Sequence, residues 1–513
     1  MSDSTYGMTV MNMELEPGFW RATNSSKEVL PCLNEDHCKG GAEPSELCSE
    51  GYEGPLCAVC MGDYAATGSG ADMQCKACTG SATATVAAGA SVFVVVVSLF
   101  AFKLFKTRSG VVVGASDAVL ARSDFKSLIA KYQPPAKIVL SYAQIVSGLS
   151  FVYDIRFPVA FTAMVNAISV VVNLDFVGFM PIGCVASTNF HSSLVGYTLG
   201  PLVVFAAMLL LFWTKKESKP EFANRLFSYF LALTFLILPS VSIKIFSTFA
   251  CRIFDEDYGS FLKADYSIDC DGDEHALFQG YALVMILVYP VGIPLMYFVL
   301  LFRKRAMLDP GQLKFTRELG SEEAGLAKAL EERERLELGD PGLKSLAFLY
   351  DAYEPQRWWF EVFETGRRLL LTGGLLFLSP GTAGQIAASM VMCLGAMRIY
   401  AGYKPFVDHG NSLLAECAQW QLFFTMFAAL LIRVDVDKES VQDKAMFDAV
   451  LVGVQFAAVV VLVTQYLFCK TDKEAVEDAV KHARASYTKA DQGAEGERVD
   501  FELVKRDTEG LEL

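Results

Sequence analysis

The chain has 513 residues, 53% of them hydrophobic, and its formal net charge is −14. This acidic balance argues against a nucleic-acid partner, because binding to phosphates needs a basic surface. The apolar residues gather in runs, several of which are long enough to cross a hydrocarbon core of about 30 Å. The sequence therefore predicts an all-α polytopic membrane protein with the lipid bilayer as its main partner.

Residues 1–80 predict a small, loop-rich module held together by cysteines. It contains seven of them: Cys32, Cys38, Cys48, Cys57, Cys60, Cys75 and Cys78. Disulfide bonds are one interpretation, and a zinc site built from the two Cys-x2-Cys pairs is the other, because their spacing is close to that of a zinc ribbon. A glycosylation sequon at Asn24 favours an extracytosolic module with disulfides and without a metal.

The first twenty residues lack the basic segment and the apolar run of a signal peptide. We expect the first membrane span to export the module as a reverse signal-anchor, because Lys and Arg are sparse before this span and frequent after it. A chain start that omits a signal peptide is the alternative.

The region 81–470 predicts a multi-pass transmembrane domain. We expect about nine spans, at 83–105, 135–153, 193–214, 225–249, 276–302, 357–379, 384–403, 413–433 and 447–469. The apolar stretch 156–180 is interrupted by Asn166, Asn173 and Asp175, and it is either re-entrant or a further span. The re-entrant assignment keeps the basic loops on one side of the membrane.

Basic residues near span ends collect on the cytosolic side of a membrane. With an extracytosolic N-terminus, nine crossings place these residues on one side: Lys103, Lys106, Arg108, Lys215, Lys216, Lys219, Arg225, Arg303, Lys304, Arg305, Lys470 and Lys473. The C-terminus is then cytosolic, in the plasma membrane or an endomembrane. This topology makes 303–356 a cytosolic insert with a solvated helix, and 471–513 an acidic tail that is first helical and then disordered.

The same topology places three more cysteines on the extracytosolic side, at Cys184, Cys251 and Cys270. Seven cysteines cannot all pair within the module, whereas ten cysteines can pair completely. Cys251 and Cys270 flank one loop and are natural partners, which leaves Cys184 to tie the re-entrant region to the module. The other cysteines are expected to be packing residues: Cys393, Cys417 and Cys469.

Two helices that contain proline are candidates for a hinge or gate. In the fifth span, Pro290 and Pro294 flank Gly292, and each proline removes a backbone donor, so the helix must kink or break. The freed carbonyl groups then need a polar partner inside the membrane. Pro239 in the fourth span is a lesser case, and a static kink is the alternative for both helices.

Charged residues gather at the expected inner edge of the sixth, seventh and eighth spans. The set consists of six charged residues and one neighbouring tryptophan: Trp358, Glu361, Glu364, Arg367, Arg368, Arg398 and Glu416. Charges inside a span are costly, and they normally pair or line a polar path. The alternatives are a buried network between helices, an ion-conducting or gating role, and anchoring at the headgroups. We expect Arg398 to pair with Glu416.

The loop before the fifth span carries Asp269, Asp271 and Asp273, a pattern like the beginning of a calcium loop. The glycine and the final glutamate of an EF-hand are missing from their positions, so at most a weak Ca²⁺ site is expected, and no other cofactor. Lys244 lies near the outer end of the fourth span and is expected to extend toward the interface. Because no catalytic motif is found and the five histidines do not cluster, the chain is not expected to be an enzyme.

Several motifs resemble those of known families. GFWRA, followed by GYEGPLCAVCMGDY and a further Cys-x2-Cys, resembles the cysteine-rich repeat of ephrin-type receptors and EGF-like modules over residues 17–80. YPVGIPLMYFVLL, FLYDAYEPQRWWFEVFETGRRLLLTGG and LLAECAQWQLFFTMFAALL resemble protist multi-pass proteins in which such a repeat precedes a domain similar to TRP-like channel proteins. The resemblance implies a channel domain capped by a disulfide-stapled module.

These observations favour a TRP-like cation channel or related transporter. Its partners would be inorganic cations, and a homo-oligomer is compatible with this class. The alternative is a cell-surface receptor or adhesion protein that signals through its cytosolic insert and tail.

Overall fold

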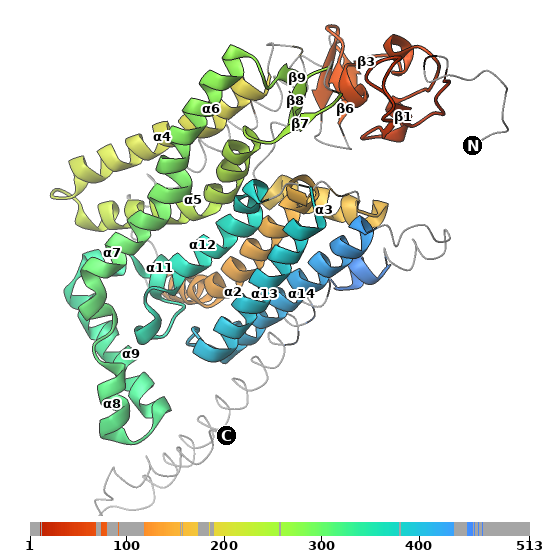
Figure 1. Cartoon of the computed structure of the whole chain (residues 1–513). Helices are drawn as coiled ribbons and strands as arrows, with labels where there is room; N and C mark the ends of the chain where they lie inside the picture. Colours follow the sequence, from red (N-terminus) through yellow and green to blue (C-terminus); the bar gives the residue numbers. More distant parts are fainter. Residues whose placement is uncertain are drawn as a thin grey trace, which may run out of the picture. The chain divides into compact units, whose positions relative to one another are not determined.

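The computed structural model describes residues 11, 13–67, 73–78, 91, 117–153, 155, 157–172, 184, 189–255, 258–378, 381–434, 449–454, 456, 460 and 464, and Figure 1 shows the whole chain. The chain divides into two units, Met1–Gln455 and Phe456–Leu513. Every element named below belongs to the first unit.

The cysteine module consists of short antiparallel strand pairs and single helical turns. β1 (Phe19–Trp20) pairs with β2 (Leu30–Pro31), β3 (Tyr52–Glu53) with β4 (Val59–Cys60), and β5 (Tyr64–Thr67) with β6 (Gln74–Ala77). The turns are η2 (Glu35–His37), η3 (Pro44–Glu46) and η4 (Pro55–Cys57). Such short elements bury little apolar surface, which explains why the module needs covalent cross-links.

Helices form most of the remaining described residues. The first set is α2 (Asp117–Tyr153), α3 (Val159–Val172), α4 (Phe190–Lys215), α5 (Pro220–Ser247), α6 (Asp273–Ile286), the π-helix η7 (Leu287–Val291) and α7 (Gly292–Leu308). An insert follows, with α8 (Gln312–Leu319), α9 (Glu322–Gly339), α10 (Pro341–Lys344), α11 (Ala347–Tyr350) and η8 (Pro355–Arg357). The last set is α12 (Phe360–Thr372), η9 (Gly374–Phe377), α13 (Ala383–Tyr403) and α14 (His409–Arg433).

A small antiparallel sheet between α5 and α6 carries the cysteine module. Its strands are β7 (Cys251–Ile253), β8 (Ser260–Leu262) and β9 (Asp265–Asp269). Trp20 of the module meets Phe254 and Tyr258 edge-on, with ring centroids 5.3 and 5.6 Å apart, and Ser26 donates a hydrogen bond to Asp255. Trp20 and Phe254 belong to one buried core, so the module and the sheet form a continuous structure (Figure 1).

Six helices of the described part are long and apolar enough to cross a membrane. They are Tyr132–Tyr153, Phe190–Lys215, Pro220–Ser247, Asp273–Leu319, Ala383–Tyr403 and His409–Arg433. The chain is therefore an integral membrane protein, mostly helical, with a disulfide-rich N-terminal part. The nine expected spans are not confirmed. Within 83–105 the structure describes only residue 91, and it describes 447–469 only in part.

The expected span at 357–379 is not one helix. α12 ends at Thr372, and Gly373 separates it from η9, which begins at Gly374. A Cβ atom at Gly373 would lie 2.4 Å from the Phe246 ring, so this close packing needs glycine. Val407, just after α13, donates to the carbonyl of Ala352, which precedes α12. α12 and η9 together therefore run antiparallel to α13 over a similar length.

Two large buried apolar clusters fill most of the helical region, and a smaller third cluster lies around Tyr353, Phe360 and Tyr400. One joins α4, α5, α6 and α7 with α10 and α11, around Tyr289 and Tyr297. The other joins α2, α3, α13 and α14, around Tyr153 and Leu422, and of these α2, α13 and α14 lie side by side in Figure 1. α12 packs against α2, α5 and α7, so it lies at the junction of the two clusters.

Candidate functional site

α12 places four charged side chains in the protein interior. Glu361, Glu364, Arg367 and Arg368 are all buried, and Glu361 and Arg368 have no exposed surface. Residues three or four apart share one face of a helix, and here that face meets α2, α5 and α7. These four residues and their partners are called the buried charged cluster below; the partners are Lys137, Gln144, Tyr353, Tyr400 and Gln419.

Glu361 is held from two neighbouring segments. Lys137 of α2 forms an ion pair with Glu361 Oε2 at 2.7 Å, and the Tyr353 hydroxyl donates to the same oxygen at 2.9 Å. Burial raises the pKa of Tyr353 well above its ordinary value, so this hydroxyl keeps its proton. The Lys137 ammonium also donates to the carbonyl of Phe348 at 2.9 Å and lies 4.4 Å from the centre of its ring. The carboxylate, the carbonyl group and the ring thus attract the ammonium of Lys137, whereas its low exposure to solvent and the nearby Arg368 oppose its positive charge.

Glu364 is the centre of a second group. Arg367 Nε donates to Glu364 Oε2 at 2.9 Å, and Arg367 Nη2 donates to Oε1. The hydroxyl of Tyr400 on α13 also donates to Oε2, and Arg367 Nη1 donates to Gln419 Oε1 on α14 at 3.1 Å. A bidentate arginine–carboxylate pair fixes geometry as well as charge, so this group ties α12 to α13 and α14.

Arg368 joins the cluster to the predicted hinge at Pro239. Because Pro239 has no N–H group, it cannot donate to the carbonyl of Phe235, four residues earlier in α5. Arg368 Nη2 donates to that carbonyl at 3.2 Å, and Arg368 Nη1 donates to Gln144 Oε1 at 3.0 Å. Gln144 Nε2 in turn donates to the next carbonyl, of Leu236, at 2.8 Å. Arg368 thus supplies a donor to the carbonyl group that Pro239 leaves without its helical partner, and Gln144 supplies one to the neighbouring carbonyl group.

A small cavity lies within the cluster. Its volume is about 20 Å³, which is enough for one water molecule and too small for an organic substrate. Lys137, Glu361, Glu364, Arg367 and Tyr400 contribute to its walls. The arrangement suits binding of water, a proton or a bare ion.

Three of the predicted residues lie outside the cluster. Trp358 is half-buried and its ring lies near Phe302. Arg398 is exposed, Glu416 is half-buried, and no ion pair joins them among the residues that the structure describes. On α13 the buried positions include Tyr400, and Arg398, two residues earlier, therefore lies on another face.

Five of the nine residues of the cluster were not predicted from the sequence. Lys137 and Gln144 are seven residues apart and so share one face of α2, in a span that is polar for its length. That periodicity was the available signal for both residues. Tyr353, Tyr400 and Gln419 are uncharged and lie in separate elements, so only the tertiary structure brings them to the site.

At the predicted hinge in the fifth span, the helix continues through a π-helical turn. η7 contains Pro290, and Gly292 and Pro294 lie in the first turn of α7. A Cβ atom at Gly292 would lie 2.9 Å from the carbonyl oxygen of Leu287, so this wide turn depends on glycine. π-helical turns occur frequently at functional sites.

Three tyrosines hold the two halves of the broken span. Tyr281 and Tyr289 bond to the hydroxyl and the backbone carbonyl of Thr198, each at 2.5 Å. Tyr297 bonds to the hydroxyl of Thr234 at 2.8 Å. The break is thus clamped to α4 on one side and to α5 on the other.

The ten cysteines assigned to one side of the membrane form five disulfides. The bonds are Cys32–Cys38, Cys48–Cys57, Cys60–Cys75, Cys78–Cys184 and Cys251–Cys270. Cys57, Cys60, Cys75 and Cys78 therefore do not form a zinc site. Among the described residues, Cys393 and Cys417 are free thiols, and Cys469 lies outside the described residues.

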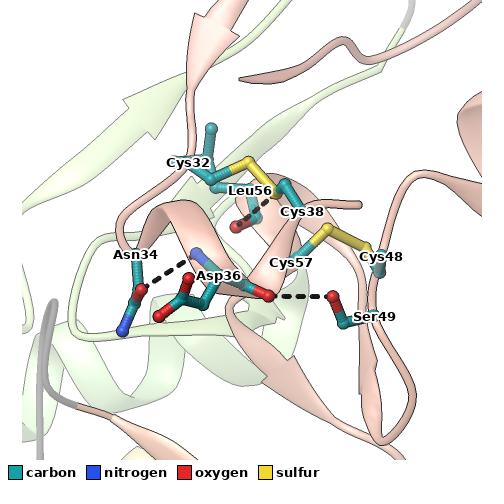
Figure 2. The surroundings of a disulfide bond; sticks show 8 residues. All are labelled: Cys32, Asn34, Asp36, Cys38, Cys48, Ser49, Leu56 and Cys57. Atoms are coloured by element: carbon teal, nitrogen blue, oxygen red, sulfur yellow. Dashed lines mark hydrogen bonds between the residues drawn. A yellow bond between two sulfur atoms is a disulfide. The ribbon is translucent and has the colours of Figure 1, made fainter. Parts of the chain in front are cut away.

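Two of these disulfides lie next to each other in the module, as Figure 2 shows. The turn η2 lies in the loop that the Cys32–Cys38 bond closes, and Asn34 caps it by accepting a hydrogen bond from the backbone of Asp36 at 3.1 Å. Ser49, which follows Cys48, donates to the carbonyl of Asp36 at 2.9 Å. The polar bonds and the disulfides therefore fix the same turn.

Two histidines meet although they are far apart in the chain. His191 Nε2 of α4 lies 3.1 Å from His275 Nδ1 of α6, and both rings are buried. The His191 ring also stacks on Phe278, with centroids 4.0 Å apart. The expectation that the histidines do not cluster is therefore wrong for this pair.

The three aspartates of the predicted calcium loop are exposed. Asp269 accepts a hydrogen bond from the backbone of Asp271, and Asp271 accepts one from Ser260. Asp273 begins α6. These bonds explain the local turn, and calcium binding stays a prediction.

Two further predicted positions are in contact with neighbours. The Lys244 ammonium lies 4.4 Å from the centre of the Phe190 ring. The Asn24 side chain donates to Glu43 at 3.3 Å. Glycosylation of Asn24 stays a prediction.

Protein-family models, curated proteins and solved structures were all compared with the chain, and none of them matches it. The likeness to ephrin-type and EGF-like repeats and to TRP-like proteins therefore rests on the sequence motifs alone.

Proposed function

We propose that this integral membrane protein is a cation channel or a related transporter, and that cations pass through the buried charged cluster. The observation that carries the proposal is the burial of Glu361, Glu364, Arg367 and Arg368 beside membrane-capable helices, with the Lys137 side chain, 11% exposed, paired to Glu361. Ionisable groups are costly in a membrane interior, and they usually mark a path for ions or protons.

Irregular helices beside the cluster support the same function. Pro239 removes a backbone donor within α5 where Arg368 is bonded, and η7 is a π-helical turn in the α6–α7 span, which also packs on α12. Irregular backbone at membrane depth is tolerated where protein groups bond it or where it lines a polar cavity. Charges that served only as anchors would lie at the surface, whereas Arg368 has no exposed surface.

The cysteine module fits this function as a lid. It is bonded to the membrane domain through Cys78–Cys184 and packs on the β7–β9 sheet. The motifs that resemble TRP-like proteins point to the same class. A receptor or adhesion protein is the competing class, which would use the module for binding and would conduct no ions.

Ion flux into vesicles that contain the purified full-length chain is the direct test. The vesicles are loaded with a thallium-, calcium- or pH-sensitive dye and compared with protein-free vesicles under an imposed potential. We expect protein-dependent entry of at least one of the three cations. No entry of any of them, with protein that is monodisperse by gel filtration, would exclude the proposal and favour the receptor class.

A cavity-filling variant tests the position of the path. Ala418 lines the cavity, and Ala418→Leu adds an isopropyl group to a packed wall, which we expect to lower the flux and to cost about 1–3 kcal/mol of stability. Ala401→Leu, at an exposed position of α13, is the matched control and should keep the wild-type flux. Equal flux through both variants would place the path elsewhere.

A further inference from the structure

The two buried glutamates of the cluster differ in how their carboxylates are bonded. Both oxygens of Glu364 accept hydrogen bonds, from Arg367 and Tyr400. Glu361 receives both of its donors, Lys137 and Tyr353, at Oε2. Its Oε1 atom has no donor within the described protein, although the side chain is completely buried and lines the cavity. A water molecule in that cavity of about 20 Å³ is the donor that fits.

The charges of the cluster do not balance when every group is ionised. Lys137, Arg367 and Arg368 are cationic, and only Glu361 and Glu364 are anionic, which leaves one positive charge uncompensated. An uncompensated charge is costly in a membrane interior. Arginine does not release its proton in proteins, whereas a buried lysine can. Loss of one proton from Lys137 is therefore the step that neutralises the cluster.

We infer that Lys137 and Glu361 form a reversible proton-binding site, and that the proton is a cation carried through this region. The inference rests on the proposed function and identifies the proton as a cation that the protein conducts. In the release step, the Lys137 ammonium gives one proton, through a water molecule in the cavity, to the free Oε1 atom of Glu361, which leaves a neutral amine and a carboxylic acid. The carboxylic acid then gives the proton to water outside the cavity, which restores the carboxylate, and uptake is the reverse sequence.

The other ionisable groups around the pair do not exchange this proton. They are Tyr142 on α2, Glu364, Arg367 and Arg368 on α12, Tyr297 on α7, Tyr353 before η8 and Tyr400 on α13. The tyrosines stay neutral near pH 7 and the arginines stay charged. Glu364 is held by the bidentate contact with Arg367. The exchange therefore belongs to Lys137 and Glu361.

Two variants test the site in vesicles that contain the full chain and the pH-sensitive dye pyranine, under a potassium diffusion potential. Lys137→Arg keeps the positive charge and the ion pair but cannot release a proton, so we expect proton entry to fall to the level of protein-free vesicles. Glu361→Gln keeps the shape and removes the carboxylate, and we expect the same loss. Lys314→Arg makes the same exchange at an exposed position of α8 and should keep the wild-type proton flux.

The outcomes separate this inference from the proposed function. Wild-type protein that conducts thallium or calcium but no protons would overturn the inference alone, and wild-type protein that conducts no cation would overturn both. Undiminished proton flux in Lys137→Arg and Glu361→Gln would also overturn the inference. Gel filtration and thermal unfolding check each variant, and Glu361→Gln alone decides if Lys137→Arg does not fold.

Discussion

At the scale of single residues, Arg368 replaces a hydrogen-bond donor that the backbone lacks. The carbonyl of Phe235 loses its normal partner because Pro239 has no N–H group, and Arg368 supplies the donor. Its guanidinium also lies 4.0 Å from the centre of the Phe235 ring. A buried carbonyl without a donor would be costly, so Pro239 and Arg368 stabilise the fold only as a pair.

This pairing predicts non-additive effects on stability. We expect Arg368→Met to destabilise the protein by roughly 1–3 kcal/mol, because it leaves the carbonyl of Phe235 unbonded. Pro239→Ala restores a backbone donor, so the double variant should be more stable than the sum of the single effects, by about 1 kcal/mol. Thermal unfolding in detergent measures the effect.

Pro201→Ala in α4 is the control for that cycle, because it also removes a proline from within a helix. Its effect should add to that of Arg368→Met without coupling. Equal coupling for both prolines would mean that Arg368 does not act through the carbonyl of Phe235.

Part of the charged cluster could be predicted from its residues. Glu361, Glu364, Arg367 and Arg368 stand out because charge is rare in an apolar stretch. The hydrogen bond from Arg368 to the carbonyl of Phe235 could not be predicted, because the sequence does not state which helices pack together.

At the scale of elements, the α6–α7 span shows which structural features can be predicted from the sequence and which cannot. Two prolines around one glycine predict a break, and the structure places η7 there. The three tyrosine contacts that hold the break depend on α4 and α5 and leave no pattern in the sequence. The division of the expected span at 357–379 near Gly373 also depends on tertiary structure. Only the contact of Gly373 with Phe246 shows why glycine is needed there.

The two glycines of this span are expected to respond in opposite ways to a methyl group. Gly292→Ala places a Cβ atom 2.9 Å from the carbonyl oxygen of Leu287, and we expect a loss of about 1–3 kcal/mol. Gly280→Ala meets no atom within 4 Å, so the better helix propensity of alanine should stabilise α6 by about 0.5–1 kcal/mol. Thermal unfolding of both variants measures the difference, and equal shifts would contradict the close contact at Gly292.

At the scale of the whole molecule, the Cys78–Cys184 bond constrains the topology. Bonded residues must lie on the same side of the membrane, so the chain crosses an even number of times between them. α2 contains one candidate span in this interval, and α3 has 14 residues, about 21 Å, which is short for a hydrocarbon core of roughly 30 Å. The odd number of cysteines in the module and the expected position of Cys184 on the same side of the membrane were enough to predict this bond. The aromatic contacts of the module with β7–β9 could not be predicted.

Removing Cys184 should expose its partner and no other cysteine. In non-reduced, denatured protein, Cys184→Ser should gain one thiol that reacts with maleimide–polyethylene glycol, and peptide mapping should identify it as Cys78. The free energy of unfolding should also fall, by about 2–4 kcal/mol. A new thiol at another cysteine, or none, would show that the module is closed by a different bond.

The connectivity of the five disulfides also sets an order of assembly during biosynthesis. Four bonds join cysteines 6, 9, 15 and 19 residues apart, so each can close once its own segment has reached an oxidising compartment. Cys78 must wait for Cys184, 106 residues later, and for the intervening chain to enter the bilayer. A nascent chain therefore carries one unpaired module thiol that oxidising enzymes and chaperones can recognise until membrane insertion has brought its partner into place.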